Sequence, residues 1–137
     1  MGRWGGKTRR MNESEVAAGL APTPNYRYAD VVGDRLFLAG QVPLDGAGTL
    51  IVPGDVTAQT HQCLTNLFDL IAVHGFTPAD IHRLTIYVVG PQEHLGIAWR
   101  AMTDRFDDDV PPATLLGVHL LGYVDQLVEI DAHVERG

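Results

Sequence analysis

The order of the predicted elements favours an α+β fold, with a single mixed β-sheet and two helices on one face. Two stretches carry apolar residues at helical spacing, and short apolar or β-branched runs lie before, between and after them. The resulting order is β-β-α-β-α-β-β, in effect two similar β-α-β halves. The second face of such a sheet has no cover from its own chain. A bare apolar sheet face usually marks a subunit interface, so we expect an oligomer.

The first strands are predicted to form a hairpin within residues 30–42. Apolar runs lie on both sides of Gly33-Asp34, a dipeptide typical of tight turns. Thr49–Val52 predicts a further short strand, which Pro53-Gly54 would end.

The first helix is expected from Asp55, a favourable N-cap residue, to about His74, with Gly75 as its natural stop. Its apolar residues recur at helical spacing and define the buried stripe: Val56, Cys63, Leu64, Leu67, Phe68, Leu70 and Ile71. Because Cys63 lies on this stripe, we interpret it as an inert core residue rather than a nucleophile.

The second half repeats the pattern. Residues 81–89 read as a buried strand that Gly90-Pro91 ends, and residues 92–106 as an amphipathic helix. The expected inner face of this helix consists of Leu95, Ala98, Trp99, Met102 and Phe106. The last two strands are expected over residues 115–121 and 126–134.

Length and charge limit the possible functions. A chain of 137 residues suits one domain, which we expect over residues 21–137 after a disordered leader at residues 1–20. A net charge of −7 argues against a general nucleic-acid binder, because such proteins need a basic surface. No apolar run is long enough to predict a membrane span. A single cysteine excludes an internal disulfide and suits a reducing cytoplasm.

No cofactor or metal is expected. The six histidines show neither an HExxH nor an HxH pattern and have no cysteine partner at ligand spacing. Gly46-Ala47-Gly48 lacks the helix and the lysine that follow in a phosphate-binding loop.

A series of short motifs resembles the RidA (YjgF) family of small proteins, over roughly residues 24–134. The matching residues are Tyr26, Leu36–Pro43, Gln59-Thr60, Asn66-Leu67, Leu84–Val88, Pro112-Ala113-Thr114 and Val128–Ala132. The resemblance implies a chorismate mutase-like fold and a homotrimer whose sheets form a central barrel. It also implies a small-molecule ligand in clefts between neighbouring subunits.

The resemblance also implies site residues. In the deaminating members, equivalents of Tyr26, Ala39-Gly40 and Glu129 line the cleft, and the glutamate helps position or activate the attacking water. An arginine that binds the substrate carboxylate stands where this chain has Thr114. Threonine offers one neutral hydrogen bond instead, and so gives up most of an interaction worth about 1.5–3 kcal/mol.

Three neighbours of this pattern are further candidates for substrate binding. Leu116 shares a strand face with Thr114, and together they suggest an apolar cleft wall. Trp99 either narrows the cleft or packs in the core. Arg27, beside Tyr26, is a candidate replacement cation. The remaining candidate cations are expected to be solvated: Arg35, Arg83, Arg100 and Arg105.

Glu129 lies in the apolar run Leu127–Ile130, which leaves two interpretations. It is either a water-orienting carboxylate with a raised pKa, or a residue on the wetter face of the sheet with Asp131 and His133. The function we expect is hydrolytic deamination of an enamine or imine, inefficient on 2-aminoacrylate because Thr114 replaces the arginine. Non-catalytic binding of a small ligand is the alternative, and different chemistry on the same scaffold is a third possibility.

Overall fold

The computed structural model describes residues 11–137, in which five strands, three α-helices and one short 3₁₀ helix follow in sequence. In chain order the elements are α1 (Glu13–Ala17), β1 (Ala29–Val32), β2 (Arg35–Leu38), α2 (Val56–Val73), η1 (Pro78–Asp80), β3 (Ile81–Val89), α3 (Gln92–Thr103), β4 (Ala113–Val118) and β5 (Val128–Glu135).

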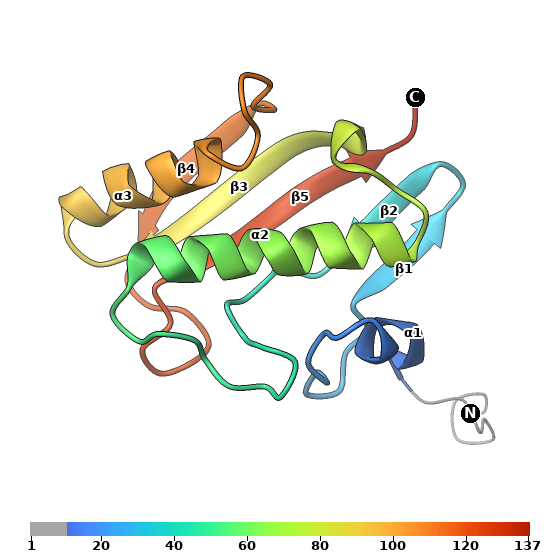
Figure 1. Ribbon diagram of the computed structural model, residues 1–137, viewed down its shortest axis with the longest axis horizontal. Helices are drawn as coiled ribbons and strands as arrows, with labels where there is room; N and C mark the ends of the chain where they lie inside the picture. The colour runs from blue at the N-terminus through green and yellow to red at the C-terminus, as the bar shows by residue number, and fades with distance from the viewer. Residues whose placement is uncertain (1–10) are drawn as a thin grey trace.

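The strands form one mixed sheet in the order β1-β2-β5-β3-β4, with β3 and β4 parallel and the other neighbours antiparallel. Helices α2 and α3 lie side by side across one face of this sheet (Figure 1). The predicted α+β class, the mixed sheet and the two covering helices are therefore confirmed.

The core lies between α2, α3 and the sheet. Leu64, Leu67 and Ile71 of α2 are completely buried, as are Leu84 and Ile86 of β3. Local signals set the ends of α2, because the Asp55 side chain accepts a hydrogen bond of 2.9 Å from the backbone N–H of Ala58. At the other end Gly75 takes a positive φ of 81°, which glycine adopts without strain.

Three expectations about these elements were wrong. Thr49–Val52 forms no strand, and only an isolated bridge joins Leu44 to Leu50. Helix α3 stops at Thr103, and the residues up to Phe106 continue as turns. Trp99 does not belong to the inner face of α3, because its side chain is 37% exposed while Ala98, Ala101 and Met102 are buried.

The N-terminal segment differs from the expected disordered leader. Residues 1–10 lie outside the described residues, but Glu13–Ala17 form α1 and Leu20 is buried against Tyr28 and Leu70. Glu15 Oε2 also lies 2.7 Å from His74 Nε2 at the end of α2. These contacts reach residues far along the chain, so a helix of five residues is stable here although its local sequence does not predict it.

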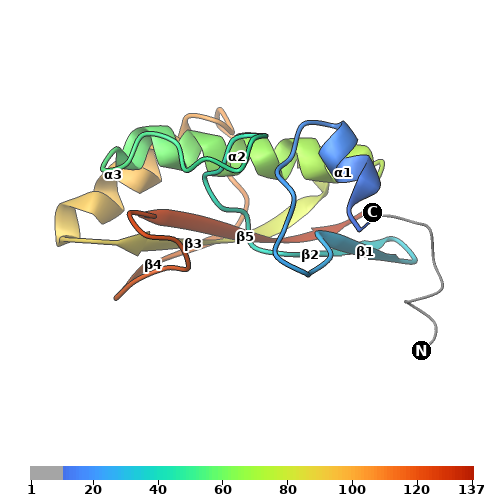
Figure 2. The same cartoon turned by 90° about the horizontal axis from the view of Figure 1, so that it is seen from below.

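The opposite face of the sheet, called the open face below, carries no helix among residues 11–137. Figure 2 shows the three helices together on the other side. By register and strand alternation, the open face includes Arg83, Thr85, Thr114 and Glu129. Phe37 of β2 is also on this face and is exposed.

Candidate functional site

A hollow of about 450 Å³ lies where β2 has ended and β5 begins, and it is called the Glu129 hollow below. Its lining comes from two parts of the chain. The first supplies Pro24, Tyr26, Ala39, Gly40 and Val42, and the second supplies Gly122, Tyr123, Gln126 and Glu129. All these residues except Glu129 belong to loops or strand extensions, so other parts of the molecule must fix their positions.

The loop after β2 is fixed by Asn66 of α2. Its side-chain amide donates hydrogen bonds of 2.9 Å to the carbonyl oxygens of Val42 and Leu44. Gln41 forms a two-way backbone bridge with Ile130 of β5. The backbone of residues 39–44 is therefore tied to both the helix and the sheet.

The loop before β5 is fixed by two buried glutamines. Gln59 of α2 is completely buried, and its side-chain oxygen accepts a hydrogen bond of 2.8 Å from the backbone N–H of Leu127. Gln126 is 3% exposed, and its side-chain oxygen accepts a hydrogen bond of 3.1 Å from the N–H of Tyr123. Because a buried amide without partners is costly, these bonds hold the loop in one conformation.

Tyr26 is positioned by the N-terminal segment. The Asn12 side chain donates a hydrogen bond of 3.0 Å to the carbonyl oxygen of Tyr26 and accepts one of 2.8 Å from the N–H of Tyr28. The hydroxyl of Thr23 donates to the same Tyr26 carbonyl. The segment that contains α1 therefore holds one side of the hollow.

Gly40 lies directly against the carboxylate of Glu129. A Cβ atom added to Gly40 would overlap with Glu129 Oε2, so the absence of a side chain is what lets the carboxylate sit there. The other carboxylate oxygen, Oε1, accepts a hydrogen bond of 3.3 Å from the side-chain amide of Gln126. Gly40 thus leaves room for the carboxylate, and Gln126 bonds to it.

Burial raises the pKa of the Glu129 carboxyl, and the negative charge of Asp131 adds to the rise. The hydrogen bond from Gln126 opposes it without cancelling it. Burial also raises the pKa of the Tyr26 phenol, with smaller contributions from Tyr123 and Glu129. The hollow therefore holds a carboxylate that takes up a proton more readily than a free glutamate, and a phenol that keeps its proton.

The structure brings together four of the eight residues that the sequence suggested, namely Tyr26, Ala39, Gly40 and Glu129. Thr114 and Leu116 lie on β4, where their partners on β3 are Thr85 and Tyr87. Glu129 is the partner of Tyr87 on the other side of β3, so Thr114 and Leu116 share a sheet face with Glu129 but do not line the hollow.

The other two suggested residues lie elsewhere on the chain. Arg27 forms an exposed ion pair with Asp30 at 3.6 Å and does not line the Glu129 hollow. Trp99 belongs to α3, on the helical side of the molecule, and lines neither of the hollows described here.

Sequence reasoning did not identify Tyr123 and Gln126 as site residues. Both lie in the connection between the last two strands, which looks like an ordinary turn in the sequence. The available signal was the spacing of Gln126, three residues before a carboxylate in an apolar run. It indicates a site only when Gln126 is known to be buried.

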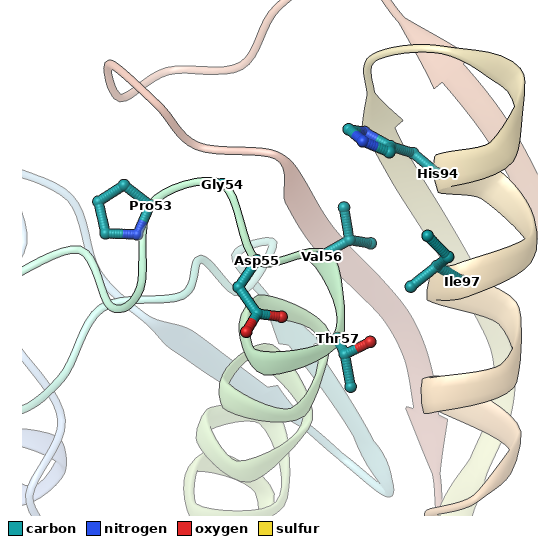
Figure 3. Close-up of a pocket in the computed structure, with 7 residues that line it drawn as sticks. All are labelled: Pro53, Gly54, Asp55, Val56, Thr57, His94 and Ile97. Carbon is teal, nitrogen blue, oxygen red and sulfur yellow. The ribbon is translucent and has the colours of Figure 1, made fainter.

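A second hollow of about 430 Å³ lies at the start of α2, between residues 53–57 and the side chains of His94 and Ile97 (Figure 3). Two of its polar side chains have partners: Asp55 caps α2, and His94 Nδ1 lies 2.9 Å from the carbonyl oxygen of Val89. We interpret this hollow as a feature of the packing.

Three further features of residues 11–137 bear on a metal site, a membrane span and a cysteine nucleophile. No group of three or more metal-ligating side chains gathers there. No helix in this part of the chain is long and apolar enough to cross a membrane. Burial also raises the pKa of the Cys63 thiol well above its usual range, which makes it a poor nucleophile.

Comparison with known proteins places this chain in a family. Residues 17–136 match the family model described as Endoribonuclease L-PSP. A RutC family protein of Sulfurisphaera tokodaii is 33% identical over 85% of this chain and 91% of its own length. A 2-iminobutanoate/2-iminopropanoate deaminase of Dermatophagoides farinae is 24% identical over 75% of this chain and 81% of its own.

The fold is similar to that of the YjgF gene product of E. coli. The two structures superpose with a TM-score of 0.74 at 23% identity, covering 94% of this chain and all of the other. At this level of identity the likeness concerns the fold alone.

Proposed function

Because this chain belongs to the Endoribonuclease L-PSP family, which includes the RidA (YjgF) proteins, we propose that it hydrolyses a small imine or enamine. The observation that supports this most is the carboxylate of Glu129, which has room beside Gly40 and a hydrogen bond from Gln126, in a hollow beside Tyr26. A desolvated carboxylate with a raised pKa is suited to general acid–base catalysis near neutral pH. The deaminase among the relatives is consistent with this chemistry.

The proposed reaction adds water to a carbon–nitrogen double bond. Glu129 takes a proton from the water as the water oxygen forms a bond to the carbon of the protonated imine and the C=N π electrons move to nitrogen. Glu129 then gives this proton to the nitrogen of the amino alcohol. The C–N bond breaks, the hydroxyl proton passes to the departing ammonia, and a carbonyl product remains. An enamine would first gain a proton on carbon to become the imine. The Tyr26 hydroxyl, which keeps its proton, is available to donate a hydrogen bond to the substrate.

The position of Thr114 limits the expected substrates. In the proposed alignment it stands where the deaminating relatives have an arginine, and its hydroxyl cannot bind a carboxylate in two-pronged, charge-assisted fashion. Thr114 therefore cannot bind the carboxylate of 2-aminoacrylate as the arginine does. If no other cation takes over this role, we expect 2-aminoacrylate to be an inefficient substrate. Leu116, two residues along the same face, would make this wall more apolar.

We also propose that the protein is a homotrimer in which neighbouring subunits complete each ligand cleft. The open face supports this, because it has no cover among residues 11–137 and includes the exposed Phe37. In addition, no residue of β4 lines the Glu129 hollow within one chain, so this side of the cleft is left for a neighbouring subunit to complete. We further propose that the trimer is cytoplasmic and needs no cofactor.

RNA cleavage, which the description of the family suggests, is less well supported for this chain. The net charge of −7 disfavours a polyanionic substrate, and among residues 11–137 no Lys, Arg or His lines the Glu129 hollow. Non-catalytic binding of a small ligand in the same clefts is the second candidate. It is favoured by the replacement of the arginine by Thr114, since a protein that only binds its ligand is expected to lose the catalytic cation.

The test is release of the carbonyl product from enzymatically generated 2-aminoacrylate and from a panel of bulkier imines, above the uncatalysed rate. Glu129→Gln keeps the size of the side chain but removes the base, so turnover should fall by about 10²–10⁴-fold. Binding of the carbonyl product should persist in this variant. Native protein that binds these ligands but never accelerates their hydrolysis would favour the non-catalytic function.

A further inference from the structure

The open face carries a cation directly beside Thr114. Arg83, near the start of β3, donates a hydrogen bond of 2.9 Å from its guanidinium Nη2 to Thr114 Oγ1 on β4. Arg83 is two residues before Thr85, the register partner of Thr114, so its side chain extends along the face toward that residue. The expectation that Arg83 is merely solvated misses this contact.

The charge of Arg83 has no partner of opposite sign among residues 11–137. The ion pairs in this part of the chain join Arg27 to Asp30, His74 to Glu15 and Arg136 to Asp34. The partner of Arg83 on β5 is His133, with Asp131 and Glu135 two residues to either side, yet the guanidinium bonds to β4 on the other side. The cation is thus held in place by a neutral hydroxyl.

A hydroxyl acceptor at residue 114 leaves most of the guanidinium available. Arginine has five N–H donors in a planar fork, and Thr114 uses one of them. The remaining donors can bind a carboxylate through two parallel hydrogen bonds. An arginine at residue 114 would instead place a second positive charge beside Arg83. With threonine at residue 114, the cation at this place on the open face is that of the neighbouring Arg83.

We propose that Arg83, oriented by Thr114, is the residue that binds the carboxylate of an anionic ligand. Within one chain, Thr114 is two strands away from Glu129 and two residues apart from it along the strands, a separation of about 12 Å. The assignment rests on the assembly proposed above, in which a second subunit covers the open face and Arg83 enters that subunit's Glu129 hollow. The hollow, which no cation among residues 11–137 lines, would then receive one from its neighbour.

The probe is 2-oxobutanoate, the carbonyl product of 2-iminobutanoate, with 2-butanone as its counterpart without a carboxylate. Dissociation constants would be measured by NMR titration for the native protein, Arg83→Ala, Arg83→Lys and Thr114→Val. Arg100→Ala, which removes the same charge from the helical side, is the control. Size-exclusion chromatography would check that each variant keeps the native assembly.

Arg83→Ala should weaken binding of 2-oxobutanoate by about tenfold or more and leave binding of 2-butanone unchanged. Thr114→Val, which keeps the cation but removes its acceptor, should cause a smaller loss that is again specific to the acid. Arg83→Lys should recover part of the affinity, and Arg100→Ala should resemble the native protein.

Equal losses for both probes, or acid binding that does not depend on Arg83, would overturn the assignment. If Arg83→Ala fails to assemble, Thr114→Val alone decides, and an unchanged preference for the acid would count against it. Acid binding that depends on Arg83 without any imine turnover would support the assignment and refute the hydrolase. If turnover depends on Glu129 but the KM for 2-iminobutanoate is unchanged in Arg83→Ala, the hydrolase is supported and the assignment of Arg83 is refuted.

Discussion

Two carboxylates in this protein, the buried Glu15 and the half-buried Glu129, have opposite environments. Glu15 is 5% exposed, and its carboxylate accepts hydrogen bonds from its own backbone N–H, His74 and Ser14. Burial alone would raise its pKa, but these bonds outweigh burial and lower it. Glu129 has only the Gln126 amide and lies beside Asp131, and its pKa is raised.

The difference separates a structural carboxylate from a reactive one. Glu15 is stabilised as an anion by partners that anchor α1 to α2. No cation among residues 11–137 lines the hollow beside Glu129, so its ionised form is poorly compensated and ready to accept a proton. Both carboxylates are partly removed from water, which by itself raises the pKa of each, and their partners decide the role.

The largest expected effect comes from crowding the Glu129 carboxylate. Gly40→Ala would place a Cβ atom where Glu129 Oε2 now lies, so the carboxylate must move. A shift of about 1 Å in a catalytic group can cost on the order of 100-fold in rate, and we expect a loss of that size in kcat/KM for imine hydrolysis.

Gly122→Ala is the matched control for this change, because Gly122 lines the same hollow and a Cβ atom there meets no other atom within 4 Å. Similar activity of the two variants would show that the contact between Gly40 and Glu129 does not position the carboxylate.

Removing the support of the loop before β5 should have the next largest effect. Gln59→Leu leaves the buried N–H of Leu127 without its acceptor, which should lower the free energy of unfolding by about 1–3 kcal/mol. Urea denaturation would measure this, with Gln92→Leu at an exposed position of α3 as the control. An unchanged unfolding midpoint would mean that the loop keeps its conformation without Gln59.

A smaller, pH-dependent effect is expected at Glu15. Because its pKa is lowered on folding, Glu15 contributes stability above the pKa of a free glutamate, and this is lost as the pH falls through its lowered pKa. Glu15→Gln should therefore destabilise the protein by about 1 kcal/mol near neutral pH, and by less in acid. Thermal unfolding across that range would show it. A difference that grows in acid would contradict the assigned sign.

The smallest effect, of opposite sign, is expected at Glu129. Its pKa is raised on folding, so its favourable contribution is complete below the pKa of a free glutamate and is lost as the pH rises through the raised value. Glu129→Gln should then be slightly more stable than the native protein near neutral pH, with the gain disappearing in acid. A variant that is less stable at neutral pH would indicate that the Glu129 anion has an unrecognised partner.

The sequence was sufficient for elements whose signals are local. The Asp55 cap, the stop at Gly75 and the apolar stripe of α2 all lie within one stretch of chain, and they predicted its bounds closely. Helix α1 has no such signal, since its stability depends on His74 and on the cluster around Leu70.

The site divides in the same way. Tyr26, Ala39, Gly40 and Glu129 could be suggested from motifs, and they surround one hollow. The roles of Gln59 and Gln126 depend on burial and on partners in distant loops. The contact between Arg83 and Thr114 depends on the register of β3 against β4, which a single sequence does not reveal.

The most direct test is an NMR titration of the glutamate side-chain carboxyls, with Glu15→Gln and Glu129→Gln used to assign the two signals. The pKa of Glu129 should lie above the value of 4.5 for a free glutamate, and that of Glu15 below it. The acidic limb of kcat/KM for imine hydrolysis should follow the titration of Glu129. A Glu129 pKa at or below that of Glu15 would contradict its assignment as the reactive carboxylate.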